Sequence, residues 1–204
     1  MMYPAFLKLT GRKVLLVGGG PVAAGKLDGL LAAGAHVTVV APVVRPEIEC
    51  AGVVVHRRPF EENDLADSWL VVAAAPPDVN REVARAAERR RVFVNAVDDP
   101  ANASLYLGGV VRRNGITIAI STEGRAPALA GLMREALDAW LPIDIDEWLA
   151  VADEARREWK REGVPMDRRR PLLLDTLNRL YTNRDTGLGA RDSGAAVSEH
   201  REVT

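Results

Sequence analysis

Cysteine is almost missing from this chain of 204 residues, in which Cys50 is the single example. One thiol can form neither an internal disulfide nor a cysteine cluster around zinc, which excludes a disulfide-stapled secreted domain and fits a reducing cytoplasm. The three histidines are scattered without the spacing of metal ligands. The sequence therefore predicts a cytoplasmic protein with no metal site of its own.

Long apolar runs and an excess of either charge are also missing. No window approaches the ~18 uncharged apolar residues that a spanning helix needs, and the first residues, MMYPAFLKLTGRK, lack the apolar stretch of a signal peptide. Lysine and arginine number 27 against 28 acidic residues, so no global field favours nucleic acid. We expect a globular protein that binds neither a membrane nor nucleic acid, in which local basic groups hold any anionic ligand.

Strands and helices alternate through the first half of the chain. The run KVLLV at 13–17 ends at three glycines, a helical pattern follows at 21–33, and a second strand-like run, HVTVV, spans 36–40. Further strands are predicted at 53–55, 69–74 and 92–95, with a helix at about 78–90. Such alternation predicts a parallel sheet covered on both faces, and right-handed crossovers then give a Rossmann-like, doubly wound α/β fold.

The pattern changes after Pro100. Predicted strands at 105–112 and 116–121 flank Asn114-Gly115, a hairpin signal because both residues tolerate positive φ. Helices are expected at about 127–140, 145–162 and 168–181, and the composition from Asn183 onward predicts a tail without periodic structure. The predicted organisation is a nucleotide-binding domain at 1–112, a hairpin and helix segment at 113–142, a small helical domain at 143–182 and a tail at 183–204.

A glycine-rich turn joins the first predicted strand to the first helix. Residues 18–23, GGGPVA, match the pattern G-x-G-x-x-[GA] in the required setting between a strand and a helix. Gly18 permits the tight turn, Gly20 lets the backbone approach a pyrophosphate, and Ala23 allows close helix packing. The helix N-terminus supplies N–H groups to the diphosphate. We interpret this turn as a dinucleotide site; the alternative is a tight turn that binds nothing.

The acidic residue that usually binds the ribose hydroxyls, about 20 residues further on, is absent. The sequence has Val40-Ala41-Pro42-Val43 at that place. Arg45 lies just beyond and could accept a 2′-phosphate, while a solvated loop charge is an equally good interpretation of it. The residues alone therefore leave NAD and NADP open.

Three motifs together resemble the precorrin-2 dehydrogenase family of siroheme synthesis, a dehydrogenase and chelatase module that is also found fused within larger siroheme synthases. GGGPVAAGK at 18–26 is similar to the family's GGGxVAxxK, NAVDDP at 95–100 to its N-x-V-D-x-P, and STEGRAPALA at 121–130 to its S-[ST]-x-G-x-S-P-x-L-A. The motifs follow the family's order and spacing over roughly residues 3–140. Two departures concern the substrate pocket: Ala126 replaces the usual serine, and Leu107-Gly108-Gly109 replaces a segment with phenylalanine and proline.

The resemblance implies NAD-dependent oxidation of precorrin-2 to sirohydrochlorin, with insertion of ferrous iron into the product as a second activity in some members. It also implies a homodimer in which the segment after the nucleotide-binding domain mediates association. By similarity, Pro21, Val22, Pro42 and Val43 would contact NAD, beside Gly18, Gly20 and Ala23 of the turn.

Asp98 is the residue that the resemblance marks as catalytic. It follows the predicted strand at 92–95, at a carboxyl end where doubly wound sheets bind ligands. A carboxylate beside a nicotinamide could take the proton that accompanies hydride transfer, and in a chelatase it could take protons from pyrrole N–H groups. The alternative is that Asp98 or Asp99 caps the turn before Pro100. With the resemblance, we favour catalysis by Asp98 and leave Asp99 to the turn.

The substrate class that the resemblance implies carries many carboxylates, so we expect groups that bind them near the third motif. The candidates are the hydroxyls of Ser121 and Thr122 and the guanidinium groups of Arg125 and Arg134. Arg112 and Arg113 are further candidates, although for these two and Arg134 a plain surface charge is the simpler interpretation. For Lys26, a phosphate contact and a solvated role compete evenly.

Two other functions remain open at this point. One is a non-catalytic sensor or regulatory subunit that binds a dinucleotide through the same turn and gives Asp98 no task. The other is a dehydrogenase of another small molecule, which would transfer hydride from ordinary alcohols and not from precorrin-2.

Overall fold

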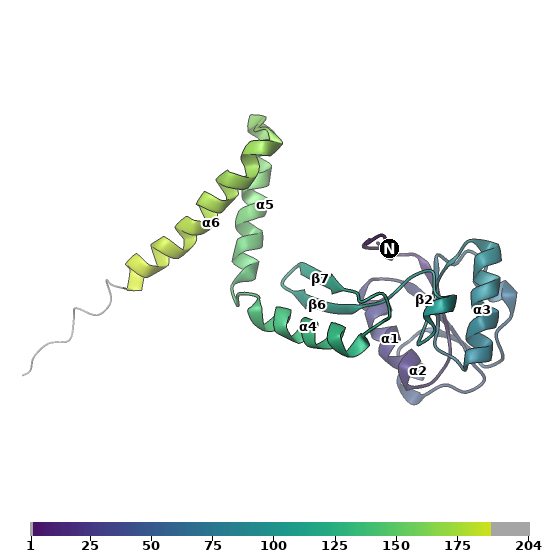
Figure 1. Ribbon diagram of the computed structural model, residues 1–204. Coiled ribbons are helices and arrows are strands. Elements are labelled where there is room, and N and C mark those ends of the chain that lie inside the picture. The colour runs from purple at the N-terminus through teal and green to yellow at the C-terminus, as the bar shows by residue number, and fades with distance from the viewer. Residues whose placement is uncertain (1, 189–204) are drawn as a thin grey trace, which may run out of the picture. The chain divides into compact units, whose positions relative to one another are not determined.

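The computed structural model describes residues 2–188 of the chain (Figure 1). It divides into two compact units, the first made of Met1–Gly109 with Ala119–Arg134 and the second of Val110–Ile118 with the residues from Glu135 onward. The division passes through the hairpin and through the helix after it, whereas the sequence placed boundaries at 112 and 142. When a boundary between units falls inside a strand or a helix, the local sequence contains no signal that marks the boundary.

The first unit contains a five-stranded parallel sheet. Its strands are β1 (Lys13–Val17), β2 (His36–Val40), β3 (Val54–His56), β4 (Leu70–Ala73) and β5 (Phe93–Ala96), in the order β3-β2-β1-β4-β5. The chain runs outward from β1 to β3 and then restarts beside β1 at β4, so the strand order reverses between these two strands. Doubly wound folds bind ligands at the carboxyl ends beside such a reversal. The predicted Rossmann-like α/β fold is confirmed.

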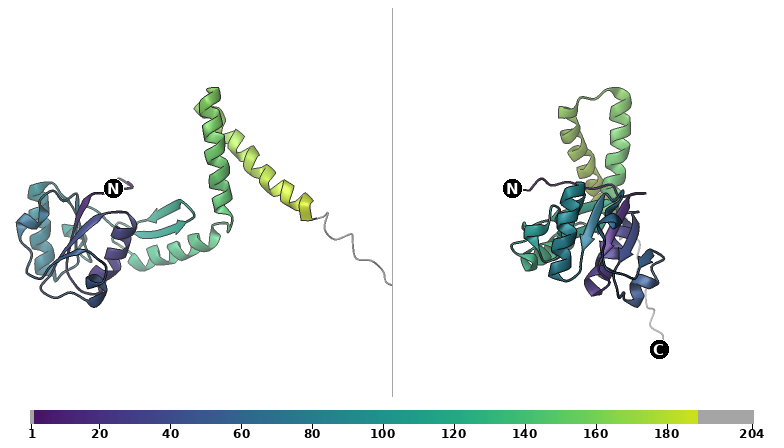
Figure 2. Two further views of the ribbon diagram at one scale, coloured as in Figure 1. Left: turned by 180° about the vertical axis from the view of Figure 1, so that it is seen from behind. Right: turned by 90° about the vertical axis from the view of Figure 1, so that its right-hand side faces the viewer.

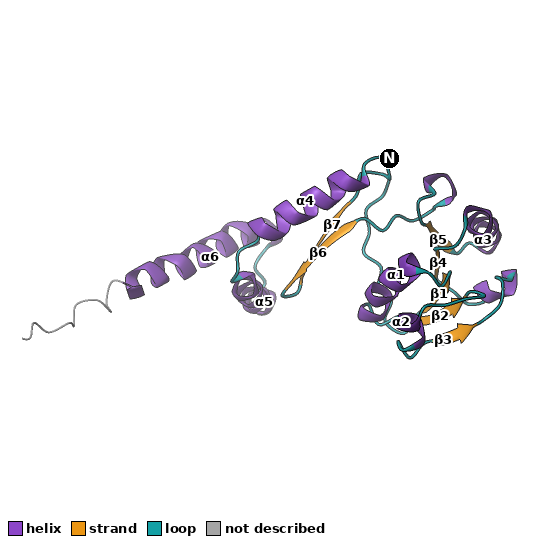
Figure 3. Ribbon diagram, turned by 90° about the horizontal axis from the view of Figure 1, so that it is seen from below, coloured by secondary structure: helices purple, strands orange, loops and turns teal. Residues whose placement is uncertain are grey.

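Apolar residues cover both faces of this sheet, because successive strand residues point to opposite sides. Leu16 of β1 belongs to the core cluster that also contains Leu27 of α1 (Pro21–Ala32). Its neighbour Leu15 belongs to the cluster that contains Val83 of α3 (Pro77–Arg90). Figure 3 shows α1 and α3 on opposite sides of the sheet. Packing on both faces holds the carboxyl ends of the strands in fixed positions.

The predicted hairpin forms between β6 (Gly109–Arg113) and β7 (Ile116–Ile120). Asn114 and Gly115 both have positive φ, 45° and 86°, as a tight two-residue turn requires. The first strand starts later than the predicted residue 105, because Ser104 and Leu105 donate their backbone N–H groups to the carbonyl oxygen of Val94 in β5. That contact is long-range, so the local pattern could not reveal it.

Three helices follow the hairpin: α4 (Pro127–Trp140), α5 (Ile145–Glu162) and α6 (Met166–Leu188). A short turn at Gly163, with φ of 72°, joins α5 to α6 (Figure 2). Trp148 Nε1 donates a hydrogen bond of 2.7 Å to the Tyr181 hydroxyl, and the two rings meet edge to face with centroids 6.0 Å apart. None of the helices in the described part of the chain is long and apolar enough to cross a membrane.

Helix α6 differs from the prediction in its length. It reaches Leu188, although the predicted helix ends at 181 and the predicted tail begins at 183. The polar residues that follow Asn183 contain no proline and, before Gly187, no glycine, so nothing in them stops a helix. The rest of the predicted tail, 189–204, lies outside the described residues.

Candidate functional site

The turn between β1 and α1 is built from glycines because its backbone is tightly surrounded. Gly18 has a φ of 126°, and a Cβ atom on it would overlap the carbonyl oxygen of Ala74, which follows β4. A Cβ atom on Gly19 would overlap the carbonyl oxygen of Val43. At Gly20 the surroundings are open, with no heavy atom within 4 Å of the place where a Cβ would lie. The third glycine therefore leaves space for a ligand to approach the backbone.

The start of α1 presents backbone N–H groups to this space. Gly20 is the N-cap residue, Pro21 is the first residue of the helix, and neither a side-chain cap nor an acidic residue occupies the first turn. The N–H groups of the first turn and the positive end of the helix dipole are consequently available to an anion. Ala23 is fully buried, as close packing of the helix on the sheet requires. These features fit the pyrophosphate of a dinucleotide.

The loop after β2 packs directly on the glycine turn. The backbone N–H of Arg45 donates to the carbonyl oxygen of Gly19 over 2.9 Å. Val43 is 80% exposed beside the turn and Val22 of α1 is 47% exposed, so both present apolar surface at the proposed cofactor site. The structure thus brings together the two segments, 18–23 and 42–43, that the sequence assigned to NAD.

Arg45 is not a free cation. Its Nε and Nη2 atoms donate to the two carboxylate oxygens of Glu47 over 3.1 and 2.8 Å. The hydrogen bonds from the Arg45 guanidinium lower the pKa of Glu47 to about 2. Glu47 lies on α2 (Pro46–Glu49), a short helix that the sequence analysis did not predict. The proline after Arg45 and the acid two residues from it are the local signals of this arrangement.

Asp98 opens onto a cavity of about 370 Å³ within the first unit. This volume is within the range of roughly 300–1,000 Å³ that is typical of small-molecule sites. The lining comes from α1, from the segment after β5, from the segment before β6 and from the turn between β7 and α4. Its polar side chains are those of Lys26, Asn95, Asp98, Asp99, Tyr106, Ser121 and Thr122.

Hydrogen bonds hold the backbone around Asp98 while its own carboxylate stays free. The Asn95 side-chain amide donates to the carbonyl oxygen of Leu105 over 3.0 Å, and the Tyr106 hydroxyl donates to that of Pro100 over 2.8 Å. Asp99 accepts a hydrogen bond of 2.8 Å from the Asn102 side chain. Asp98 is exposed with a φ of 55°, and its carboxylate has no hydrogen-bond partner among the described residues. Asp99 thus serves the turn, and Asp98 remains available to a substrate.

A continuous set of contacts connects Asp98 to the glycine turn. Gly18 packs on the carbonyl group of Ala74, and the carbonyl oxygen of Ala73 accepts a hydrogen bond of 2.9 Å from the N–H of Val97. Val97 directly precedes Asp98. The glycine turn and the segment that carries Asp98 therefore both contact the end of β4, at the carboxyl ends of β1, β4 and β5.

Ser121 and Thr122 line the cavity, and the hydroxyl of each accepts a backbone hydrogen bond, from Glu123 and Ala126 respectively. Thr122 thereby caps the backbone at Ala126, where the family motif has serine. Arg125 and Arg134 are not among the lining residues. The cation that lines the cavity is Lys26, which the sequence analysis left undecided.

Arg113 has a structural role in the second unit. It forms an ion pair of 2.8 Å with Asp138 and donates to the carbonyl oxygen of Leu141 over 2.9 Å. Arg112 is exposed. These observations leave both arginines outside the described cavity.

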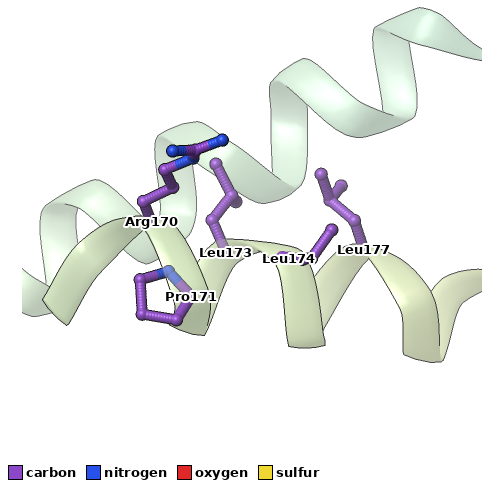
Figure 4. Close-up of a pocket in the computed structure, with 5 residues that line it drawn as sticks. All are labelled: Arg170, Pro171, Leu173, Leu174 and Leu177. Carbon is purple, nitrogen blue, oxygen red and sulfur yellow. The ribbon is translucent and has the colours of Figure 1, made fainter.

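A second hollow, of about 480 Å³, lies on α6 and contains no reactive group. Figure 4 shows its lining, which consists of Arg170, Pro171, Leu173, Leu174 and Leu177. Across residues 2–188, no group of three or more histidine, cysteine or acidic side chains is placed to hold a metal ion. Of the two cavities, the one at Asp98 carries the polar side chains that chemistry needs.

Comparison with known proteins agrees with this geometry. Residues 5–109 match the model of a family described as NAD(P)-binding. Siroheme synthase 3 of Aeromonas hydrophila is 41% identical over 172 residues, which are 82% of this chain and 37% of that relative. Siroheme synthase 2 of Cronobacter sakazakii is 40% identical over 206 residues, 96% of this chain and 45% of the relative. The chain therefore spans less than half the length of these relatives.

A solved structure covers nearly the same length. SirC, a precorrin-2 dehydrogenase, superimposes with a TM-score of 0.67 and 31% sequence identity, over 85% of this chain and 88% of SirC. The match includes the fold and extends well beyond the nucleotide-binding residues 5–109. The chain belongs to the precorrin-2 dehydrogenase family.

Proposed function

We propose that this chain oxidises precorrin-2 to sirohydrochlorin in siroheme synthesis, with NAD as the hydride acceptor. The observation that carries the proposal is that two segments both contact the end of β4: the glycine turn, which fits a dinucleotide, and the segment of Asp98, which lines a cavity. Membership of the family supports the choice of substrate. The lone Cys50 fits a cytoplasmic enzyme.

The reaction removes two hydrogens from the macrocycle, and each of them needs an acceptor at the site. Bound NAD supplies the acceptor for one hydrogen and the electron pair, which leave together as hydride. The second hydrogen leaves as a proton, which the Asp98 carboxylate accepts and passes to water at its exposed position. Asn95 and Tyr106 keep the segment of Asp98 in place through their hydrogen bonds.

A sensor without chemistry would bind a dinucleotide equally well at the glycine turn. The free carboxylate argues against it, because the Asp98 side chain makes no hydrogen bond in the described residues whereas that of its neighbour Asp99 binds Asn102. An exposed acid that lines a cavity and makes no side-chain hydrogen bond among the described residues is available for contact with a ligand.

Iron insertion is a second activity for which the same cavity would serve. Chelation exchanges pyrrole protons for the metal, and Asp98 could accept these protons as it accepts the proton of oxidation. The ferrous ion would then be a substrate rather than a resident cofactor. We include this second activity in the proposal.

We also propose that two copies of the chain associate through α4. Its exposed apolar residues recur at helical spacing and form one stripe. They are Leu129, Leu132, Met133 and Trp140. An apolar stripe of this kind on a helix is typical of a face that another surface covers.

An anaerobic incubation with precorrin-2 and NAD tests the proposed function. We expect stoichiometric NADH and the absorbance spectrum of sirohydrochlorin, and a further spectral change when ferrous iron is added. NADH without the iron-dependent change would restrict the protein to oxidation. Binding of NAD without NADH formation would instead favour the sensor, and NADH formation with simple alcohols alone would indicate another dehydrogenase.

Lys26 is expected to bind a carboxylate of the tetrapyrrole, because it is the cationic side chain in the lining of the cavity. Lys26→Gln should raise KM for precorrin-2 by about tenfold, the equivalent of roughly 1.4 kcal/mol, with a smaller change in kcat. Steady-state kinetics measure the changes in KM and kcat separately. Lys13→Gln is the matched control, since Lys13 is paired with Asp67 at the amino end of β1. Equal effects of the two substitutions on KM would contradict the assignment.

A further inference from the structure

The end of β2 lacks the acidic side chain that normally binds the adenosine ribose. In doubly wound domains an acid at this position binds the ribose hydroxyls of NAD, and its replacement near an arginine accommodates the 2′-phosphate of NADP. Here Val40 and Ala41 are buried and apolar, and Arg45 follows. By that rule alone, the loop would favour NADP.

The backbone fixes Arg45 beside the dinucleotide turn. Its N–H donates to the carbonyl oxygen of Gly19 over 2.9 Å, and Val43, two residues earlier, packs its carbonyl group against Gly19. Arg45 is therefore tied to the turn that would hold the pyrophosphate. This places the residue next to the adenosine side of the proposed cofactor site.

The side chain of Arg45 is already engaged in a two-pronged ion pair. Nε and Nη2 donate to the two oxygens of Glu47 over 3.1 and 2.8 Å, the same fork with which arginine binds a phosphate. The low pKa of Glu47, about 2, means that this carboxylate stays ionised throughout the neutral range. A 2′-phosphate would meet an occupied guanidinium and a fixed negative charge.

The remaining charges of α2 do not compensate. Glu49 is paired with Arg57, so the arginine nearest in the sequence after α2 is also engaged. A phosphate monoester carries close to two negative charges at neutral pH, whereas the 2′-hydroxyl of NAD carries none. Arg45 and Arg57 are both engaged and so do not offer a free cation to the 2′-phosphate of NADP, whereas the 2′-hydroxyl of NAD needs none.

We propose that the Arg45–Glu47 ion pair is the specificity determinant that makes this chain select NAD and reject NADP. Glu47 acts from a short helix beyond β2 by occupying the guanidinium that would otherwise bind the 2′-phosphate. The inference rests on the proposed dinucleotide-dependent function and adds a residue that sets cofactor choice.

Titration calorimetry of the full chain with NAD and with NADP, at low ionic strength, tests this inference without any turnover. The wild type should bind NAD at least tenfold more tightly than NADP. Glu47→Gln should increase NADP affinity by about tenfold, while NAD affinity changes less than about twofold. Added salt should reduce the difference between wild type and variant, because the charges involved are exposed.

Two further variants distinguish the effect of losing the Arg45–Glu47 ion pair from the effect of removing any negative charge on α2. Glu49→Gln removes the same charge from the same helix and should leave the preference unchanged. The double variant Arg45→Gln with Glu47→Gln should lose the NADP affinity gained by Glu47→Gln, because the phosphate then has no guanidinium to bind. If the double variant loses the NADP affinity that Glu47→Gln gains, Arg45 is the group that binds the phosphate once Glu47 no longer occupies it.

Several results would overturn the inference. These are a wild type that binds NADP as tightly as NAD, an unchanged preference in Glu47→Gln, and an equal shift in Glu49→Gln. In these cases the proposed function survives as long as NAD binds. A wild type that binds neither dinucleotide would remove the proposed function and the inference together.

Discussion

Replacement of Asp98 by asparagine is expected to reduce turnover of precorrin-2 by roughly 10²–10⁴-fold, the usual contribution of a positioned acid or base. Asparagine keeps the shape of the side chain and tolerates the positive φ of 55° at this position. It cannot accept the proton at neutral pH. NAD affinity should change less than about twofold, because Asp98 is not part of the glycine turn.

Anaerobic steady-state kinetics and calorimetry on the same preparation measure the two quantities. Asp28→Asn, at an exposed position of α1, is the matched control and should behave like the wild type. Full turnover in Asp98→Asn would show that another group takes the proton, or that the proton leaves directly to water. Equal losses of turnover and NAD affinity would indicate damage to the cofactor site instead.

Alanine at Gly19 should mainly lower stability, whereas alanine at Gly20 should mainly lower NAD affinity. A methyl group at Gly19 overlaps the backbone of the β2 loop, which cannot move without breaking the bond between Arg45 and Gly19. We expect Gly19→Ala to lower the free energy of unfolding by about 3 kcal/mol. A methyl group at Gly20 meets nothing in the protein, so the loss of stability should be limited to the N-cap preference for glycine over alanine, about 1 kcal/mol or less.

The same methyl group at Gly20 would occupy the space left for the pyrophosphate. NAD affinity of Gly20→Ala should therefore fall by about tenfold or more, the equivalent of roughly 1.4 kcal/mol. Urea unfolding and calorimetry measure both variants. A stable Gly20→Ala protein that binds NAD like the wild type would place the dinucleotide elsewhere.

Much of the first unit could be predicted because its signals are local. The buried run at 14–17, the glycines after it and the proline at the start of α1 each act within a few residues. The hairpin turn at Asn114-Gly115 is of the same kind. Short-range steric rules decide such features, so the order of strands and helices follows from them.

The composition of the cavity depends on contacts that are distant in the sequence. Lys26 of α1 lines the same space as Tyr106, and no spacing rule connects the two. Arg125 belongs to the motif that supplies Ser121 and Thr122, yet it is absent from the lining. Membership of a motif places a residue near a site, whereas tertiary packing decides which side chains reach it.

The engagement of Arg45 illustrates the same limit at shorter range. The sequence shows an arginine where a 2′-phosphate would lie, and only the conformation of α2 brings the Glu47 carboxylate onto its guanidinium. Pro46 and Glu47 are local signals of this arrangement, but they indicate an occupied guanidinium only once the short helix α2 is predicted.

A crystal structure of the NAD complex tests the central claim most directly. We predict the pyrophosphate against the backbone of Gly20 and the first turn of α1, with the nicotinamide ring at the cavity that Asp98 lines. A nicotinamide ring that points away from this cavity, with the Asp98 carboxylate in bulk solvent and remote from it, would contradict the account.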